Sequence, residues 1–283
     1  MKKYLVILLA VGLFGTAINA QIEFPRVSPN AAVSQTVGYT NITVTYCRPS
    51  VHERTIWGAL VPYGQVWRTG ANEATTIQFT TDVVVSGNKV PAGRYSLFTI
   101  PTKEEWTIIL NKTDKQWGAY NYKQEDDILR FTVKPSEASF NEQLMFSFSN
   151  VSNSSAVLVL NWELLQVSFA IESDAAGQAY IKIKESIAAK PDRWQNYTDG
   201  ASFAYDNNVF LDEALQWADK AISFGPNYVP YFVKGKILFK QNKFKDALIA
   251  LDKCRETGRT DKNWNSFVSQ VDLLEKQIKS KMN

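Results

Sequence analysis

The sequence predicts an α+β chain in which an all-β sandwich or jelly-roll-like domain is followed by an all-α, tetratricopeptide-like domain. Apolar residues alternate mainly with period two between Val33 and Ile171, which is typical of half-buried strands. After the segment "ESDAAG" the period becomes helical, and part of this helical pattern recurs 33 residues later. The chain has 283 residues, 45% of them hydrophobic, which is enough for two cores. We place the β-domain at residues 24–172 and the helical domain at residues 173–283.

Residues 1–20 have the layout of a secretory signal peptide. Lys2 and Lys3 precede a short apolar run, and small residues follow up to Ala20. The run is too short to span a bilayer, and no later stretch reaches the roughly 20 apolar residues of a membrane helix. We therefore expect cleavage after Ala20 and an exported, periplasmic or extracellular protein with no membrane span.

The β-domain is predicted from short alternating segments separated by turn residues. The segments "NITVTY", "WTIIL", "ILRFTV" and "LMFSFS" each place apolar side chains on one face. "SGNK" at residues 86–89 indicates a tight hairpin, and "PAG" at residues 91–93 indicates a second turn. About nine strands without intervening helices favour a sandwich or a jelly-roll-like barrel.

The helical domain is predicted from an internal sequence repeat. "DEALQWADKAISFGPN" begins at Asp212 and "KDALIALDKCRETG" begins at Lys245, so that Ala214 and Ala247 occupy equivalent positions. A repeat of this length built from helix pairs is typical of tetratricopeptide repeats, and we expect it to bind a protein or peptide partner. Cys254 falls where two helices approach closely, so we interpret it as a small buried side chain.

The charge of the chain is close to balanced without the leader. Residues 1–172 hold 14 basic and 14 acidic side chains, and residues 173–283 hold 17 and 14. Removal of Lys2 and Lys3 leaves −2 in the first part and +3 in the second, or +1 in total. There is no dense basic patch, so nucleic acid is not an expected partner.

Few catalytic arrangements are compatible with one histidine and two cysteines. His52 is the only histidine, no G-x-S-x-G motif occurs, and the glycine-rich phosphate-binding motifs are absent. His52 and scattered carboxylates lack a recognised metal-ligand spacing, so we expect no metal and no cofactor. A disulfide between Cys47 and Cys254 stays open for an exported chain.

Glu73 is the most informative charged residue. In "NEATTIQF" it shares strand parity with Ile77 and Phe79, so an inward apolar face would carry the carboxylate inward as well. By the same parity Arg48 continues the inner face of the preceding strand. A buried carboxylate needs a partner, and we expect Arg48 or Arg68 to supply it. The pair would be either a structural plug or the floor of a polar pocket.

The segment from Asn111 to Asp127 is long for a connection between strands. Trp117, Tyr120 and Tyr122 offer flat surfaces for stacking on sugars or peptides. They would equally serve to cover the edge of the sandwich.

Four stretches between Ser28 and Ile171 are distinctive, namely "RPSVHERTIWGALVPYGQVWRTGANEATTIQF", "VPAGRYSLFTIP", "EWTIILN" and "WGAYNY". In these stretches the chain resembles domain-of-unknown-function family 2911, a group of exported bacterial proteins. The family-type residues are Arg48, Pro49, Pro62, Tyr63, Gly64, Trp67, Arg68, Gly70, Asn72, Glu73, Gly93, Tyr95 and Trp117. Cys47 departs from the serine expected in relatives. The resemblance implies a tetratricopeptide-like helical tail but no established activity.

These observations favour a non-enzymatic exported protein that binds a small polar or saccharide ligand in the β-domain. Arg48, Arg68 and Glu73 would form the charged floor, Asn72 would orient it, and Trp67, Trp117 and Tyr120 would form the rim. One alternative is a cell-envelope hydrolase acting on a saccharide or peptide, with Glu73 as an acid or base whose pKa is raised by burial. Another is a purely structural envelope protein. The solvent exposure of Glu73 separates a pocket from a sealed ion pair.

Overall fold

The computed structural model describes residues 24–282, and the predicted leader and its cleavage site lie outside this range. The strands come first: β1 (Asn30–Val37), β2 (Thr40–Cys47), β3 (Thr76–Phe79), β4 (Val83–Val85), β5 (Asn88–Val90), β6 (Gly93–Ile100), β7 (Trp106–Asn111), β8 (Asp127–Val133), β9 (Ser136–Ser149) and β10 (Ser155–Ser173). The helices follow: α1 (Ala175–Ala189), α2 (Trp194–Asn207), α3 (Leu211–Ile222), α4 (Tyr228–Lys240), α5 (Phe244–Gly258) and α6 (Trp264–Met282). The predicted α+β fold class is confirmed.

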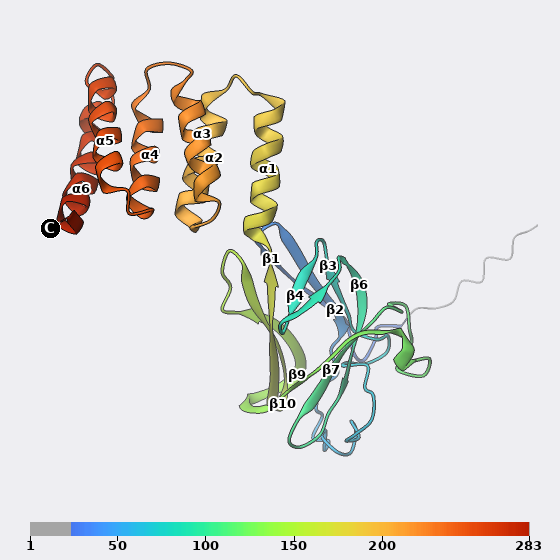
Figure 1. The fold of residues 1–283 in the computed structure, drawn as a ribbon. Coiled ribbons are helices and arrows are strands. Elements are labelled where there is room, and N and C mark those ends of the chain that lie inside the picture. The colour runs from blue at the N-terminus through green and yellow to red at the C-terminus, as the bar shows by residue number, and fades with distance from the viewer. Residues whose placement is uncertain (1–23, 283) are drawn as a thin grey trace, which may run out of the picture.

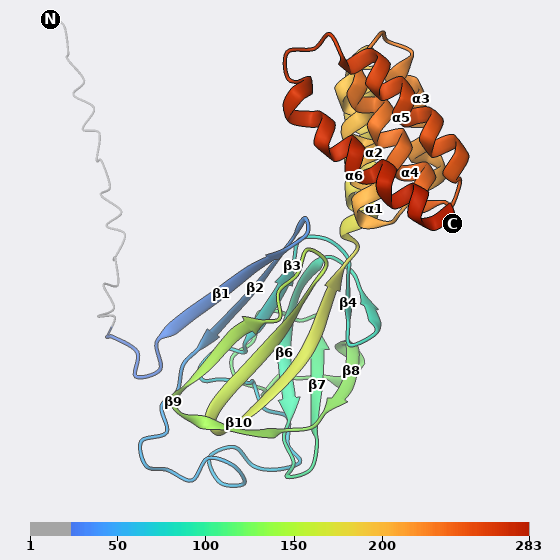
Figure 2. The same cartoon turned by 90° about the vertical axis from the view of Figure 1, so that its left-hand side faces the viewer.

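The strands form two antiparallel sheets packed on one core (Figures 1 and 2). The larger sheet has the order β1-β2-β3-β6-β7-β8, and the smaller has the order β5-β4-β10-β9. Inward-facing side chains of the two sheets meet in this core, among them Ile42, Val44, Ile77, Leu97, Leu144, Phe146, Leu158 and Leu160. Alternation along each strand thus gives the larger sheet an inner apolar face and an outer face.

The four segments with the clearest alternation lie in β2, β7, β8 and β9, as predicted. The "SGNK" hairpin joins β4 to β5, and its central residues Ser86 and Gly87 have φ values of 46° and 80°. Positive φ at both positions matches the right-handed twist of the paired strands.

The outer face of the six-stranded sheet carries a row of polar side chains. Thr45 pairs with Thr76, Thr76 with Ser96, and Ser96 with Asn111 across four neighbouring strands. Thr76, Ser96 and Asn111 are buried, because the connection between β7 and β8 folds back over them. Ser96 and Asn111 both donate hydrogen bonds to main-chain carbonyls of that connection, which fixes its path across the sheet.

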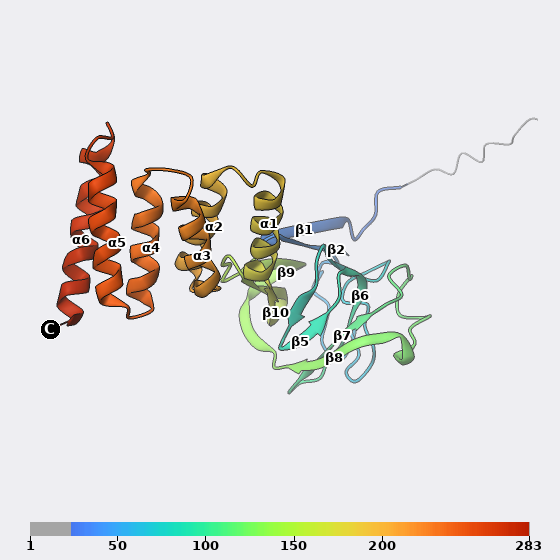
Figure 3. The same ribbon diagram turned by 45° about the horizontal axis from the view of Figure 1, so that its top comes forward.

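The six helices stand side by side in an array that extends away from the β-domain (Figures 1 and 3). The two segments related by the 33-residue repeat form α3 and α5, where Ala214 and Ala247 are fully buried. In α4, a Cβ added to Gly235 would lie 2.9 Å from Leu251 Cδ2, so glycine allows α4 and α5 to approach closely. Within residues 24–282, no helix is both long enough and apolar enough to cross a membrane.

The helical array joins the sandwich where β10 runs directly into α1. Ser173 Oγ donates to the Val37 carbonyl at 2.9 Å. One turn into α1, Gln178 Nε2 donates to Thr81 Oγ1 at 3.1 Å. These contacts fasten the first helix to the end of the sandwich at which β1 turns into β2.

Candidate functional site

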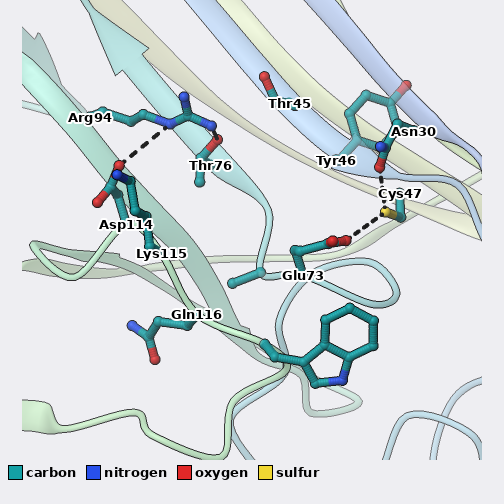
Figure 4. A pocket seen from close by; sticks show the side chains of 12 residues that line it. Asn30, Thr45, Tyr46, Cys47, Glu73, Thr76, Arg94, Asp114, Lys115 and Gln116 are labelled. Atoms are coloured by element: carbon teal, nitrogen blue, oxygen red, sulfur yellow. Dashed lines mark hydrogen bonds and ion pairs between the residues drawn. The ribbon is translucent and has the colours of Figure 1, made fainter. Parts of the chain in front are cut away.

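A pocket of about 490 Å³ opens on the outer face of the six-stranded sheet, beside the connection between β7 and β8. It is lined by Asn30, Thr45, Tyr46, Cys47, Glu73, Ala74, Thr76, Arg94, Asp114, Lys115, Gln116 and Trp117. Figure 4 shows Glu73 directed toward Cys47 on one side and Arg94 directed toward Asp114 on the other. Its volume falls within the range of about 300–1,000 Å³ that is usual for sites of small ligands.

The segment before β3 has an irregular backbone that shapes one wall of this pocket. Thr69 and Asn72 have φ values of 55° and 57°, a conformation that asparagine tolerates and threonine rarely adopts. Thr69 is fully buried and its Oγ1 donates to Thr99 Oγ1, while its carbonyl accepts from Thr75 Oγ1 at 2.8 Å. These bonds hold a strained conformation in place, which is a common property of binding sites.

Glu73 lies on the outer face of the sheet, so the prediction that it points into the core was wrong. Regular alternation begins only at Thr76, the first residue of β3, and Glu73 precedes it in the irregular segment that follows the left-handed Asn72. The main chain of Glu73 instead bridges to that of Trp117. The Glu73 side chain is 45% exposed, which identifies an open position and not a sealed plug.

Arg26 is the ion-pair partner of Glu73, and neither Arg48 nor Arg68 takes this role. Arg26 Nη1 lies 2.6 Å from Glu73 Oε2, and Cys47 Sγ lies 3.6 Å from the same oxygen. The hydrogen bond from Arg26 is the main cause that lowers the pKa of Glu73, and it outweighs the effect of partial burial. The hydrolase hypothesis, with Glu73 as an acid or base, expected burial to raise this pKa, so the direction of the shift is opposite to the one expected.

Arg48, Arg68 and Asn72 bind main-chain groups and so organise the structure around the pocket. Arg48 Nε donates to the Leu144 carbonyl at 3.1 Å and thereby ties β2 to the opposite sheet. Arg68 Nη1 donates to the Asn72 carbonyl at 3.1 Å, within the irregular segment. The Asn72 amide donates to the Ser28 carbonyl at 3.2 Å, so it orients the N-terminal segment and not Glu73.

Trp67 is partly buried, packs against the core and does not form the rim of this pocket. Its ring stacks on Trp162 at 5.9 Å between centroids with planes 17° apart, and Trp57 meets it edge-on. Its Nε1 donates to the Gly70 carbonyl at 3.1 Å. Trp67 and Arg68 also line a smaller hollow of about 230 Å³, separate from the one that contains Glu73.

The three aromatic residues of the long connection have different environments. Trp117 is 54% exposed and is among the residues that line the pocket. Tyr120 is 80% exposed and is not among the lining residues. Tyr122 packs edge-on against Phe98 and donates to Asp127 Oδ2 at 2.6 Å, so it covers the sheet as the alternative interpretation expected.

The polar residues opposite Glu73 were not predicted from the sequence. Arg94 Nε lies 3.7 Å from Asp114 Oδ2, and Arg94 Nη2 donates to Thr76 Oγ1 at 3.1 Å. Arg94 in β6 and Thr76 in β3 point to the outer face of the sheet. A polar side chain on that face usually indicates only exposure to solvent, so the sequence did not mark these two residues as part of a site. Asp114 and Lys115 belong to the connection that was already suspected of a function.

Both cysteines are free and buried, so the disulfide that the sequence left open does not form. Cys47 Sγ donates to Asn30 Oδ1 at 2.9 Å at the edge of the pocket. Burial raises the pKa of the Cys254 thiol to about 12, which agrees with its predicted role as a small core residue. His52 is exposed, and within residues 24–282 no three His, Cys, Asp or Glu side chains are grouped closely enough to hold a metal ion.

These features define a class of protein, namely an antiparallel two-sheet β-domain that carries a polar pocket on one outer face and a helical array at its C-terminal end. Residues 28–171 match the model of the family described as "Protein of unknown function (DUF2911)". This match spans just over half of the 283 residues, and the chain belongs to that family. It ends before α1, so the helices lie outside the matched region. No curated protein and no solved structure matches the chain.

Proposed function

We propose that this chain is an exported binding protein whose β-domain holds a small polar ligand in the pocket next to Glu73. The observation that carries the proposal is the half-exposed, ionised carboxylate of Glu73 beside the half-exposed indole of Trp117, in a pocket of about 490 Å³. A flat aromatic surface next to a fixed charge and hydroxyl groups can both stack on a ligand and orient it. Export follows from the predicted signal peptide and is part of the proposal.

The geometry favours this function over the two alternatives. A purely structural ion pair would be shielded from solvent, with each charged group satisfied by the other. The Glu73 side chain is instead 45% exposed. The hydrolase alternative, with Glu73 as an acid or base, needs a carboxyl group whose pKa is raised by burial, whereas the bond from Arg26 lowers its pKa.

A ligand screen with two matched variants tests the proposal. Thermal shifts and indole ¹⁵N NMR of the wild-type protein would be recorded with sugars, amino acids and short peptides. Trp117→Ala should abolish the response to any hit, because its ring lines the pocket. Tyr120→Ala removes an even more exposed aromatic residue of the same connection and should retain the response. Equal loss in both variants, or a screen without any response, would contradict the proposal.

For the helical domain we propose binding of a protein or peptide partner, as tetratricopeptide-like repeats do. Support comes from a groove of about 380 Å³ between α3, α4 and α5, in which Ile249 is 61% exposed. A selection of displayed peptides should enrich sequences that bind the wild type and fail to bind Ile249→Glu. If the enriched peptides bind Ile249→Glu as well as they bind the wild type, the groove is not the binding site.

A further inference from the structure

The contact between Arg26 and Glu73 shows which chemical group the pocket accepts. We propose that the ligand carries a guanidinium group, which replaces that of Arg26 at the Glu73 carboxylate. This inference rests on the proposed function and adds the ligand class. Arg26 then acts as a tethered competitor supplied by the chain itself.

The segment that carries Arg26 is held weakly enough to be displaced. Residues 24–29 belong to no strand or helix, and the side chains of Phe24 and Val27 are 76% and 87% exposed. Beyond the ion pair, the segment is held by the bond from the Asn72 amide to Ser28 and by the bond from the Arg48 amide to Pro29. An exposed ion pair adds little net stability, so a competing guanidinium can replace Arg26 at small cost.

Without Arg26, Glu73 would be an ionised group without a counter-charge. The two basic residues that line the pocket, Arg94 and Lys115, lie at the other side with Asp114, and Arg94 already faces that carboxylate at 3.7 Å. A guanidinium offers paired donors in one plane that match the two oxygens of a carboxylate. The neighbouring indole of Trp117 adds a surface that favours a cation over a neutral group.

Gln116 lines the pocket with its amide held in one orientation. Gln116 is 7% exposed, and its Nε2 donates to Asn111 Oδ1 and the Thr113 carbonyl. Both partners are acceptors, which fixes the orientation of the amide and leaves its oxygen on the other side. That oxygen is buried and accepts no hydrogen bond within residues 24–282. Because this oxygen is closed off from solvent, the Glu73 carboxylate, which is 45% exposed, is the acceptor that a ligand can reach on this side.

Calorimetry with a charged probe and its neutral isostere tests the proposal on the full mature chain. The probes are N-acetyl-arginine amide and N-acetyl-citrulline amide, which differ in the guanidinium group. Arg26→Ala should tighten binding of the arginine probe by about two- to fivefold, because the tethered competitor is gone. In that background Glu73→Gln should weaken it at least about tenfold. Lys279→Ala, which breaks an ion pair with the partly buried Glu275 at 2.5 Å in α6, should bind as the wild type does.

The outcomes separate this inference from the proposed function. Equal binding of the arginine and citrulline probes, or no effect of Arg26→Ala, would overturn the guanidinium assignment. If neutral sugars or peptides shift the Trp117 signal while the arginine probe does not, the assignment fails and the pocket remains a binding site. If no compound shifts Trp117 even in Arg26→Ala, both proposals fail. Where the arginine probe does bind, a parallel titration with agmatine distinguishes a free guanidino compound from an arginine within a peptide as the ligand.

Discussion

Arg26 and Glu73, 47 positions apart in the sequence, meet at 2.6 Å at the edge of the pocket on the outer face of the six-stranded sheet. The contact places a charge from the N-terminal segment on the carboxylate that the strand pattern had assigned to the core. It also explains how Glu73 can be half-exposed and yet fixed in position. Its consequences for the pKa of Glu73 can be measured directly.

Removal of Arg26 should raise the pKa of Glu73 toward its ordinary value of 4.5, because the hydrogen bond from Arg26 is the main cause that lowers it. A lowered folded-state pKa stabilises the protein above the pKa of the unfolded state, and this contribution is lost as the pH falls through the folded-state pKa. Any stability difference between wild type and Arg26→Ala should therefore disappear in acid. Carboxyl ¹³C NMR titration of Glu73 in both proteins measures the shift, and equal titration curves would exclude the contact in solution.

Substitution of Trp67 should cost far more stability than substitution of Trp117, although both were predicted rim residues. Trp67 stacks on Trp162 and bonds the Gly70 carbonyl, so Trp67→Ala should lower the free energy of unfolding by about 3–5 kcal/mol. Trp117→Ala should change it by no more than about 0.5 kcal/mol, because the ring is half-exposed. Urea denaturation of the two variants provides the comparison, and similar losses would refute the core assignment of Trp67.

Tyr122→Phe should destabilise the connection over the outer face of the sheet. The hydroxyl donates to Asp127 Oδ2 at 2.6 Å, and burial together with this bond raises the pKa of Tyr122 to about 12. Its loss leaves the buried Asp127 carboxylate with one donor fewer, at a cost of about 1–2 kcal/mol. Chemical denaturation measures the difference. Tyr120→Phe, which alters an exposed phenol nearby, is the control and should be neutral.

The two thiols should be unreactive in the native protein and both reactive after unfolding. Cys254 is fully buried, and its pKa of about 12 keeps it protonated at neutral pH. In a Cys47→Ala variant, a thiol reagent at pH 8 should modify Cys254 only when denaturant is added. Rapid labelling of the native variant, or the absence of a titratable thiol in unfolded wild type, would contradict the buried, unpaired state.

Local patterns predicted most of the fold because they report residues that alternate or repeat within short windows. Ile42, Val44 and Ile77 follow period two and are buried, and Ala214 and Ala247 mark the two equivalent helices. The strand count was slightly low because short strands such as β5, with three residues, give little alternation to detect.

The candidate site was predicted only in part, because its arrangement depends on one local irregularity and on distant contacts. Glu73 lies before β3, in the irregular segment that follows the left-handed Asn72, so the alternation on which its direction was based does not extend to it. Arg26 lies in a segment without periodicity, so nothing in the sequence links it to Glu73. Similarly, Trp67 is recognisable as a core residue only once Trp162, on the opposite sheet, is known to stack on it.

The central claim is that the pocket beside Glu73 binds a ligand with a guanidinium group. Its most direct test is indole ¹⁵N NMR of the mature wild-type protein during titration with N-acetyl-arginine amide. The pocket beside Glu73 predicts a saturable shift of the Trp117 signal, while the signals of the core residues Trp67 and Trp162 stay in place. A saturable shift of Trp67 or Trp162 with Trp117 unchanged would put the ligand elsewhere. A titration that moves none of them, in the wild type and in Arg26→Ala alike, would contradict the claim.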